Sequence, residues 1–293
     1  MVYKHKHISF NKLVVVFIGL LILSLYFYHQ FQTSIIIAEK DRINIAVFSE
    51  MPFVYSINRQ QNFAVVTYFH PDYLVKVPGG YDWYRVGSLN LLAKIEKQRV
   101  KILKTAFSEL LGAPIDFVYY PKKAQVVDQP AISFNQFYDK FLKEKLFSNS
   151  YQSSIDNIFD RIMIKNLFQV RADHLLFLDS TDLTVQERNR HYYYSDKLDT
   201  RLKGLFYHES LISQAYKAVI ITDKDKYPQA QLVLRQLEGI GIKVIEIEVV
   251  PKYKAKKCEI QTSGNQKALA NKLTRLFDCT KSVHDSEIIS YNL

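Results

Sequence analysis

Cys258 and Cys279 are the only cysteines in the chain, and their spacing limits the chemistry open to them. Their wide separation matches neither a C-x-x-C redox pair nor a zinc ligand set. Cys258 opens a predicted strand and Cys279 closes the last predicted helix, so the thiols meet if that helix packs back on the sheet. In an oxidising compartment they would form a disulfide, and otherwise they are two separate buried thiols. The pair is structural in both cases.

A second suggestive group is residues 188–195, within the stretch ERNRHYYYS at 187–195. Basic and aromatic residues mixed in this way are typical of surfaces that bind single-stranded nucleic acid. The tract also interrupts the apolar periodicity, which favours a linker between two domains packed by its tyrosines. We expect the linker and no nucleic-acid partner, because the tract is predicted to lie outside the cytoplasm.

Common enzyme classes receive no support from local motifs. The sequence contains no G-x-S-x-G elbow, Walker loop, G-x-G-x-x-G fingerprint or H-E-x-x-H motif. Its 293 residues, 48% hydrophobic and 23% charged, are ordinary for one or two globular domains. The net charge of +10 favours anionic partners such as lipid phosphates, wall polymers or nucleic acid, without naming one.

An uncharged apolar run at residues 13–31, LVVVFIGLLILSLYFYHQF, is long enough as a helix to cross a membrane. Lys4, Lys6 and Lys12 precede it, whereas the segment at 39–42 is charge-balanced, so the positive-inside rule places the N-terminus in the cytoplasm. A cleaved secretory signal is the alternative, but its apolar region is usually shorter and is followed by a small-residue cleavage site.

This topology predicts a single-pass plasma-membrane protein, with residues 1–12 as a cytoplasmic tail and all folded mass outside the cytoplasm. Tyr26 and Tyr28 fit the aromatic belt at the outer interface. His5 and His7 offer too few ligands for a metal site, and the basic tail is expected to bind anionic lipid.

Beyond the membrane segment, the apolar patterns predict two α/β units. Strands are predicted at 43–48, 53–57, 63–69 and 115–120, with a buried strand at 175–178, and helices within 88–111, 134–147 and 155–170. The segment 70–80 contains Pro71, Pro78 and the pair Gly79-Gly80, which predicts an exposed loop of the kind that often carries a site. In the second unit, strands are predicted at 218–222, 243–250 and 257–262, and helices at 227–239 and 267–277.

Three segments resemble, in order, the core elements of the LytR–CpsA–Psr (LCP) family of bacterial envelope proteins. They are MPFVYSINRQQNFAVVTYF, HPDYLVKVPGGYDWYRVGSL and ILKTAFSELLGAPIDFVYY, within residues 43–120. Residues 216–279 resemble the LytR C-terminal domain that often accompanies the family, through AVIIT, QLVLRQLEGIGIKVIEI, KCEI and KLTRLFDC. The resemblance implies an N-terminal transmembrane helix, an LCP-like α-β-α domain at 43–187, a small β-α-β-β-α domain at 196–280 and a tail at 281–293.

Active members of this family transfer glycopolymers from a polyprenyl-pyrophosphate carrier to peptidoglycan, using arginines for the pyrophosphate and carboxylates for a divalent cation. Such a leaving group concentrates negative charge, which guanidinium groups and a metal ion neutralise as the bond breaks. The resemblance makes Glu50 and Asp72 candidate ligands for Mg²⁺ and Arg85 a candidate phosphate-binding residue.

The sequence departs from the family at the residues that perform the chemistry. Pro71 stands where the family's loop motif has a phosphate-binding arginine, and proline cannot bind phosphate. The later arginine-rich motif has only Arg171, Arg188 and Arg190 as loose counterparts. We therefore expect an envelope protein that kept the architecture without the catalysis and binds wall polymer, lipid-linked glycan, peptidoglycan or an envelope protein. We assign it no cofactor, and Mg²⁺ would be the cofactor of a transferase. The alternative is a divergent glycopolymer transferase that uses a polyprenyl-pyrophosphate-linked donor.

Overall fold

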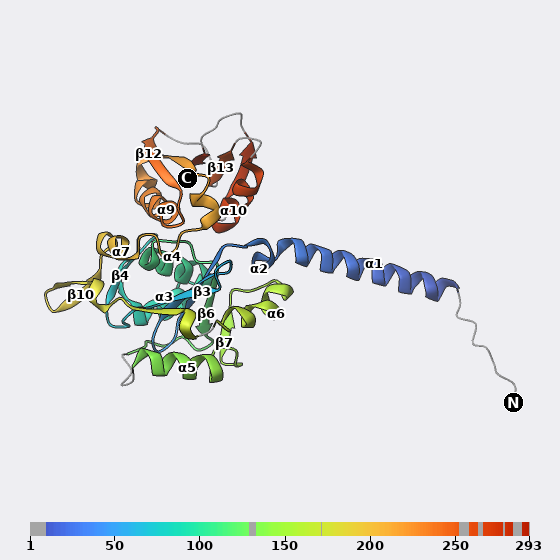
Figure 1. Cartoon of the computed structure of the whole chain (residues 1–293), viewed down its shortest axis with the longest axis horizontal. Coiled ribbons are helices and arrows are strands. Elements are labelled where there is room, and N and C mark those ends of the chain that lie inside the picture. The colour runs from blue at the N-terminus through green and yellow to red at the C-terminus, as the bar shows by residue number, and fades with distance from the viewer. Residues whose placement is uncertain are drawn as a thin grey trace.

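The computed structural model describes residues 10–128, 133–170, 172–251, 258–262, 266–277, 279–283 and 289–292. Figure 1 shows a long N-terminal helix that projects from one side of an α/β unit, and a second, smaller α/β unit that sits on the first. The predicted fold class, mixed α/β behind an N-terminal apolar helix, is confirmed.

Helix α1, Phe10–Thr33, contains the predicted membrane segment. Within it, Val14–Thr33 is long and apolar enough to cross a membrane, with a mean hydropathy of 1.9. The apolar part of this stretch is not buried in the protein. A helix that is apolar around its whole circumference and uncovered by protein needs a non-aqueous environment. The short helix α2, Ile35–Ala38, follows directly, and the Ser34 side chain accepts a hydrogen bond from the Ile37 amide at its start.

The first unit is built on a six-stranded mixed sheet with the order β7-β6-β1-β2-β3-β8. Its strands are β1 Arg42–Val47, β2 Phe53–Asn58, β3 Phe63–Tyr68, β6 Phe117–Pro121, β7 Tyr151–Ser153 and β8 Leu175–Asp179. Strands β1 and β2 are buried along their whole length, which explains their continuous apolar runs. The prediction that residues 175–178 are buried is wrong, because β8 is an edge strand whose side chains are half-buried.

Helices cover both faces of this sheet, which gives three layers. They are α3 Leu89–Ile95 and α4 Arg99–Leu111 on one face, and α5 Phe134–Glu144 and α6 Ile158–Leu167 on the other. Alternate residues of each strand enter the two cores: Val54 packs with Phe107 of α4, and Phe53 with Phe141 of α5.

A second, four-stranded sheet with the order β5-β4-β10-β9 overturns two sequence predictions. Its strands are β4 Leu74–Val77, β5 Asp82–Arg85, β9 Val185–Glu187 and β10 Arg190–Tyr193. The expected exposed loop at 70–80 contains the buried strand β4, because its prolines and glycines flank the strand rather than interrupt it. The expected linker at 188–195 is instead a hairpin whose strand β10 pairs with β4. Arg188 and Asn189 both have positive φ, as a two-residue hairpin turn requires.

The second unit has the predicted order of strands and helices and adds two further strands. Its elements, after the connecting helices α7 Ser195–Leu202 and α8 Glu209–Ile212, are β11 Lys217–Thr222, α9 Tyr227–Gly239, β12 Lys243–Val249, β13 Glu259–Thr262, α10 Lys267–Phe277, β14 Thr280–Val283 and β15 Ile289–Asn292. The sheet order is β12-β11-β15-β13-β14. The expected tail at 281–293 is therefore wrong, since β15 pairs with both β11 and β13.

The two units meet in close contact at α4 and α9. A Cβ atom on Gly239 would lie 1.8 Å from the carbonyl oxygen of Gly112, so the backbones touch at this point. Beside it, Arg235 donates two hydrogen bonds to the Asp199 carboxylate, at 2.8 and 2.6 Å, one to the Glu109 carboxylate at 2.6 Å and one to the Glu109 carbonyl at 3.1 Å. Such a forked, half-buried guanidinium fixes both the distance and the orientation of the units.

Candidate functional site

Asp72 and Arg85, two of the residues assigned by resemblance, lie in contact. Asp72 follows β3 and Arg85 ends β5, and the guanidinium Nη2 donates to Asp72 and, at 2.9 Å, to Asp128. The Asp128 hydrogen bond and the Asp72 charge raise the pKa of Arg85 despite partial burial. All three side chains are more than a third exposed, so the cluster is open to solvent.

Glu50 lies apart from this cluster. It occupies the turn between β1 and β2 and accepts a hydrogen bond from Lys145, which follows α5, at 2.8 Å. Val47 pairs with Phe53, and Phe53 pairs with Tyr68, so the turn after β1 and the segment after β3 lie at the same end of the sheet. Glu50 and Asp72 therefore lie at that end. Each carboxylate nevertheless has its own cation. Among the described residues, the group whose ligand atoms could together hold a metal ion does not include either of them.

Of the other candidate arginines, the two that the structure describes do not join Asp72 and Arg85. Arg188 lies in the β9–β10 turn and Arg190 at the start of β10, and both are exposed. Arg171 lies outside the described residues.

Arg85 borders a cluster of aromatic rings on the outer face of the four-stranded sheet. The register pairs Trp83 with Lys76 and Tyr192 with Leu74, which places these side chains opposite the core-facing Val75. Trp83 lies edge-on to Tyr192 at 5.1 Å and to Tyr194 at 5.2 Å between ring centroids. We call Trp83, Tyr192 and Tyr194 the aromatic face. Its rings are half-exposed, and the exposed cations Lys76 and Arg190 flank it.

A groove of about 580 Å³ begins beside this face and runs between the two units. The β4–β5 turn forms one wall, through Lys76, Pro78, Gly79 and Gly80, and helix α9 forms the other. Lys76 belongs to both features, so a chain-like ligand on the aromatic face could continue into the groove.

A buried charge cluster at the junction of the units was missed by the sequence analysis. Glu39, Asp41 and His208 have ligand atoms within 4.8 Å of one another and are almost completely buried. The Lys272 ammonium of α10 lies among them, 3.1 Å from Glu39, 3.2 Å from Asp41 and 2.7 Å from Nδ1 of His208. Lys272 therefore takes the position that a metal ion would need. We call these four residues the junction cluster.

The protonation states of the junction cluster follow from its contacts. Burial by itself raises the pKa of Glu39, but His208 and the Lys272 ammonium outweigh it and hold the pKa at about 2. Burial lowers the pKa of His208, and its Nδ1 lies within hydrogen-bond distance of the Lys272 ammonium and 3.7 Å from the Glu39 carboxylate. Arg275 donates a further hydrogen bond to Glu39 at 3.1 Å. The signal in the sequence was the run Glu39-Lys40-Asp41-Arg42, which we interpreted only as a membrane flank.

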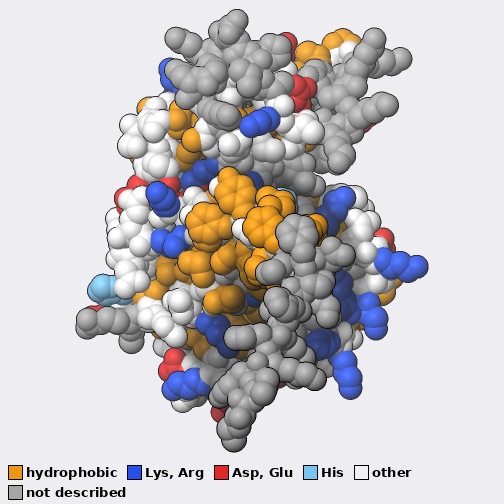
Figure 2. Space-filling view, turned by 90° about the vertical axis from the view of Figure 1, so that its right-hand side faces the viewer, with side chains coloured by type: hydrophobic (Ala, Val, Ile, Leu, Met, Phe, Trp, Pro, Cys, Tyr) orange, Lys and Arg blue, Asp and Glu red, His pale blue; other side chains and the backbone are white. Residues whose placement is uncertain are grey.

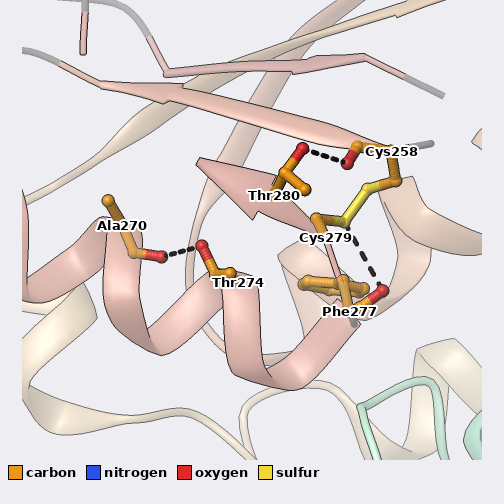
Figure 3. Close-up of a disulfide and its surroundings, with 6 residues drawn as sticks. All are labelled: Cys258, Ala270, Thr274, Phe277, Cys279 and Thr280. Carbon is orange, nitrogen blue, oxygen red and sulfur yellow. Dashed lines mark hydrogen bonds between the residues drawn. A yellow bond between two sulfur atoms is a disulfide. The ribbon is translucent and has the colours of Figure 1, made fainter. Parts of the chain in front are cut away.

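Cys258 and Cys279 form a disulfide in the structure, with their Cα atoms 4.7 Å apart (Figure 3). Cys258 directly precedes β13 and Cys279 directly precedes β14, and these strands are paired. Thr280 also donates a backbone hydrogen bond to the Cys258 carbonyl at 2.9 Å. The bond thus fastens the end of α10, which carries Lys272, to the sheet.

No protein-family model matches this chain, and no curated protein does. The solved structures to which this chain is similar include a LytR-CPS2A-psr family protein. TagT bound to LI-WTA is 12% identical and covers 57% of this chain and 90% of that one, at a TM-score of 0.42. YwtF (TagT) with bound octaprenyl pyrophosphate lipid has 12% identity, the same coverage and a TM-score of 0.40. B. subtilis TagV has 10% identity over 57% of this chain and 96% of its own, at 0.38.

Proposed function

We propose that this chain is a membrane-anchored, extracytoplasmic cell-envelope protein that binds an anionic wall polymer or lipid-linked glycan without transforming it. The observation that carries the proposal is the aromatic face, in which three rings lie together on a surface flanked by Lys76, Arg85 and Arg190. Flat apolar rings pack against the faces of sugar rings, and the cations attract phosphate or carboxylate groups along the polymer.

The membrane placement rests on other residues. Helix α1 is uncovered by protein and long enough to span a bilayer. The lysines before it favour a cytoplasmic N-terminus, which puts both folded units outside. A disulfide between Cys258 and Cys279 suits an oxidising compartment.

The contacts of the candidate catalytic residues favour binding over transfer. A transferase would need Glu50 and Asp72 to share one Mg²⁺ beside the pyrophosphate. Instead, Glu50 pairs with Lys145 and Asp72 pairs with Arg85, so each carboxylate contacts a different cation. The contact of Asp72 with Arg85 favours the transferase, because metal ligand and phosphate clamp would be neighbours there.

The test is titration calorimetry on the full chain in detergent micelles, with purified wall polymers and with polyprenyl pyrophosphate, with and without Mg²⁺. We expect polymer binding that Trp83→Ala weakens about tenfold, or ~1.4 kcal/mol. Tyr227→Ala, which removes an exposed ring from α9, is the matched control and should leave the affinity unchanged. Unchanged binding in Trp83→Ala would refute the aromatic face as the site. Magnesium-dependent binding of polyprenyl pyrophosphate that is lost in both Glu50→Ala and Asp72→Ala would instead favour the transferase.

A further inference from the structure

Helix α6 is joined to the last turn of the membrane helix. Asn157 caps α6, and its side-chain amide donates to the Gln30 carbonyl at 2.6 Å and to the Thr33 hydroxyl at 3.0 Å. The Ile158 amide donates to the Gln30 side chain at 3.2 Å. These contacts hold the start of α6 against the end of α1 from two directions.

Asp160, on the same turn of α6, fixes the angle at which α1 leaves the first unit. Its carboxylate is 2% exposed and accepts hydrogen bonds from the Ser34 hydroxyl at 2.6 Å and from the amides of Ile35 and Ile36 at 3.1 and 2.9 Å. A carboxylate at a helix N-terminus satisfies amides that have no partner within the helix. Helix α1 is thus a rigid continuation of the folded unit rather than a flexible tether.

The contact between α6 and α1 extends below the end of the membrane span. The ring of Phe159 lies 5.9 Å from that of Phe31 and 6.4 Å from that of Phe27, between centroids. Phe27 precedes Thr33 by six residues, which is about 9 Å along a helix. Tyr26 and Tyr28 are expected at the outer interface, so Phe159, which contacts Phe27 between them, lies at the level of that interface.

The side chains that α6 leaves uncovered suit that depth. Ile162 is 66% exposed, and Ile158, one turn earlier on the same side, is 36% exposed. Arg161 and Lys165 are exposed beside them. Figure 2 looks at this face along α1, which projects toward the viewer, so the apolar side chains at its centre belong largely to α1 itself, with lysines and arginines around them. On α6, exposed apolar residues beside exposed cations are the pattern of a helix that lies in a membrane interface.

We infer that α6 is a second membrane contact, which inserts Ile158, Phe159 and Ile162 into the outer leaflet while Arg161 and Lys165 face anionic lipid headgroups. The occupant of this face is the lipid that surrounds α1, because the apolar surface is continuous with that helix. The inference rests on the proposed anchoring and adds to it a fixed orientation. Two contacts hold the first unit against the bilayer, so the aromatic face is presented at a set height above it.

The inference is tested on the full chain in vesicles of phosphatidylcholine and phosphatidylglycerol. A fluorophore that responds to polarity is attached under non-reducing conditions to Ile162→Cys, and Ile158→Cys serves as a second variant in case the first does not fold. Quenching by lipids with a nitroxide at acyl carbon 5 or 12 reports depth. Leu21→Cys, in the middle of α1, is the positive control. Gln186→Cys, exposed in the hairpin at the end of the molecule away from α1, is the negative control.

We expect the label at residue 162 to be quenched by the carbon-5 lipid more than by the carbon-12 lipid, as a position about 5–10 Å below the headgroups requires. The label at 21 should show the reverse order, and the label at 186 should not be quenched. A quenched label at 21 with unquenched labels at 162 and 158 refutes the inference and leaves the anchoring intact. An unquenched label at 21 refutes the anchoring itself. A blue-shifted but unquenched label at 162 would show that protein covers the helix, which also refutes the inference.

Discussion

Two charge clusters in this molecule contain the same kinds of groups in opposite environments. The junction cluster surrounds Lys272 with two carboxylates, and its side chains are 2 to 12% exposed. The cluster of Asp72, Arg85 and Asp128 surrounds a guanidinium with two carboxylates, and its side chains are 37 to 80% exposed. In the buried cluster each charge depends on the others, because water cannot replace a lost partner. In the exposed cluster water can replace a lost partner, so the charges remain available to a ligand.

Removal of the central cation should have the largest effect. Lys272→Met leaves Glu39 and Asp41 buried next to each other without the ammonium that both contact. We expect the free energy of unfolding to fall by about 3–5 kcal/mol, measured by urea denaturation of the full chain in detergent. Lys101→Met, at an exposed position on α4, is the matched control and should change it by less than about 0.5 kcal/mol. Equal effects of the two substitutions would show that the buried contacts of Lys272 do not stabilise the fold.

Acidification should weaken the junction cluster next. The pKa of Glu39 is about 2 in the folded chain and about 4.5 in the unfolded one, so its contribution is complete above pH 4.5 and is lost as the pH falls to 2. That contribution is about 3 kcal/mol. His208 also lowers the stability of the fold as the pH falls below 6.5, because burial lowers its pKa and the unfolded chain takes up the proton more readily. Asp116 has the opposite effect on stability, because burial raises its pKa to about 6 and the folded chain takes up the proton more readily.

A comparison with Glu39→Gln isolates this contribution from that of Asp116. The difference in unfolding free energy between the native chain and Glu39→Gln should shrink as the pH falls from 5 to 3. A difference that stays constant across this range would show that Glu39 does not stabilise the fold through its charge.

A smaller loss is expected where the two units touch through backbone atoms. Gly239→Ala places a methyl group against the Gly112 carbonyl, and neither backbone can move without displacing α4 or α9. We expect a cost of about 1–3 kcal/mol, measured as for Lys272→Met. Gln231→Ala, exposed on the same helix, should be close to neutral. An equally neutral Gly239→Ala would show that the units are not in direct contact there.

The elements that could be predicted from the sequence are those that bury a continuous apolar surface. Periodicity located α9 and α10 at their observed limits and the central strands of the first sheet within a residue or two, because each buries a continuous apolar surface. It missed β4, β10 and β15, which are four residues long and are held by pairing with distant strands. It also missed the junction cluster, since Glu39 and Lys272 are 233 positions apart in the chain.

The smallest expected effect on stability is the one that most directly concerns function. Arg85→Ala breaks two ion pairs, yet all partners remain in contact with water, so the free energy of unfolding should change by no more than about 1 kcal/mol. If the exposed cluster belongs to the binding surface, the same substitution should weaken binding of an anionic polymer and reduce the dependence of that binding on salt. Calorimetric titrations at two ionic strengths measure both quantities. Arg201→Ala, which removes an exposed cation from the last turn of α7, controls for net charge. A stability loss as large as that of Lys272→Met would mean that the two clusters do not differ in kind, and Arg85 would then be a structural residue.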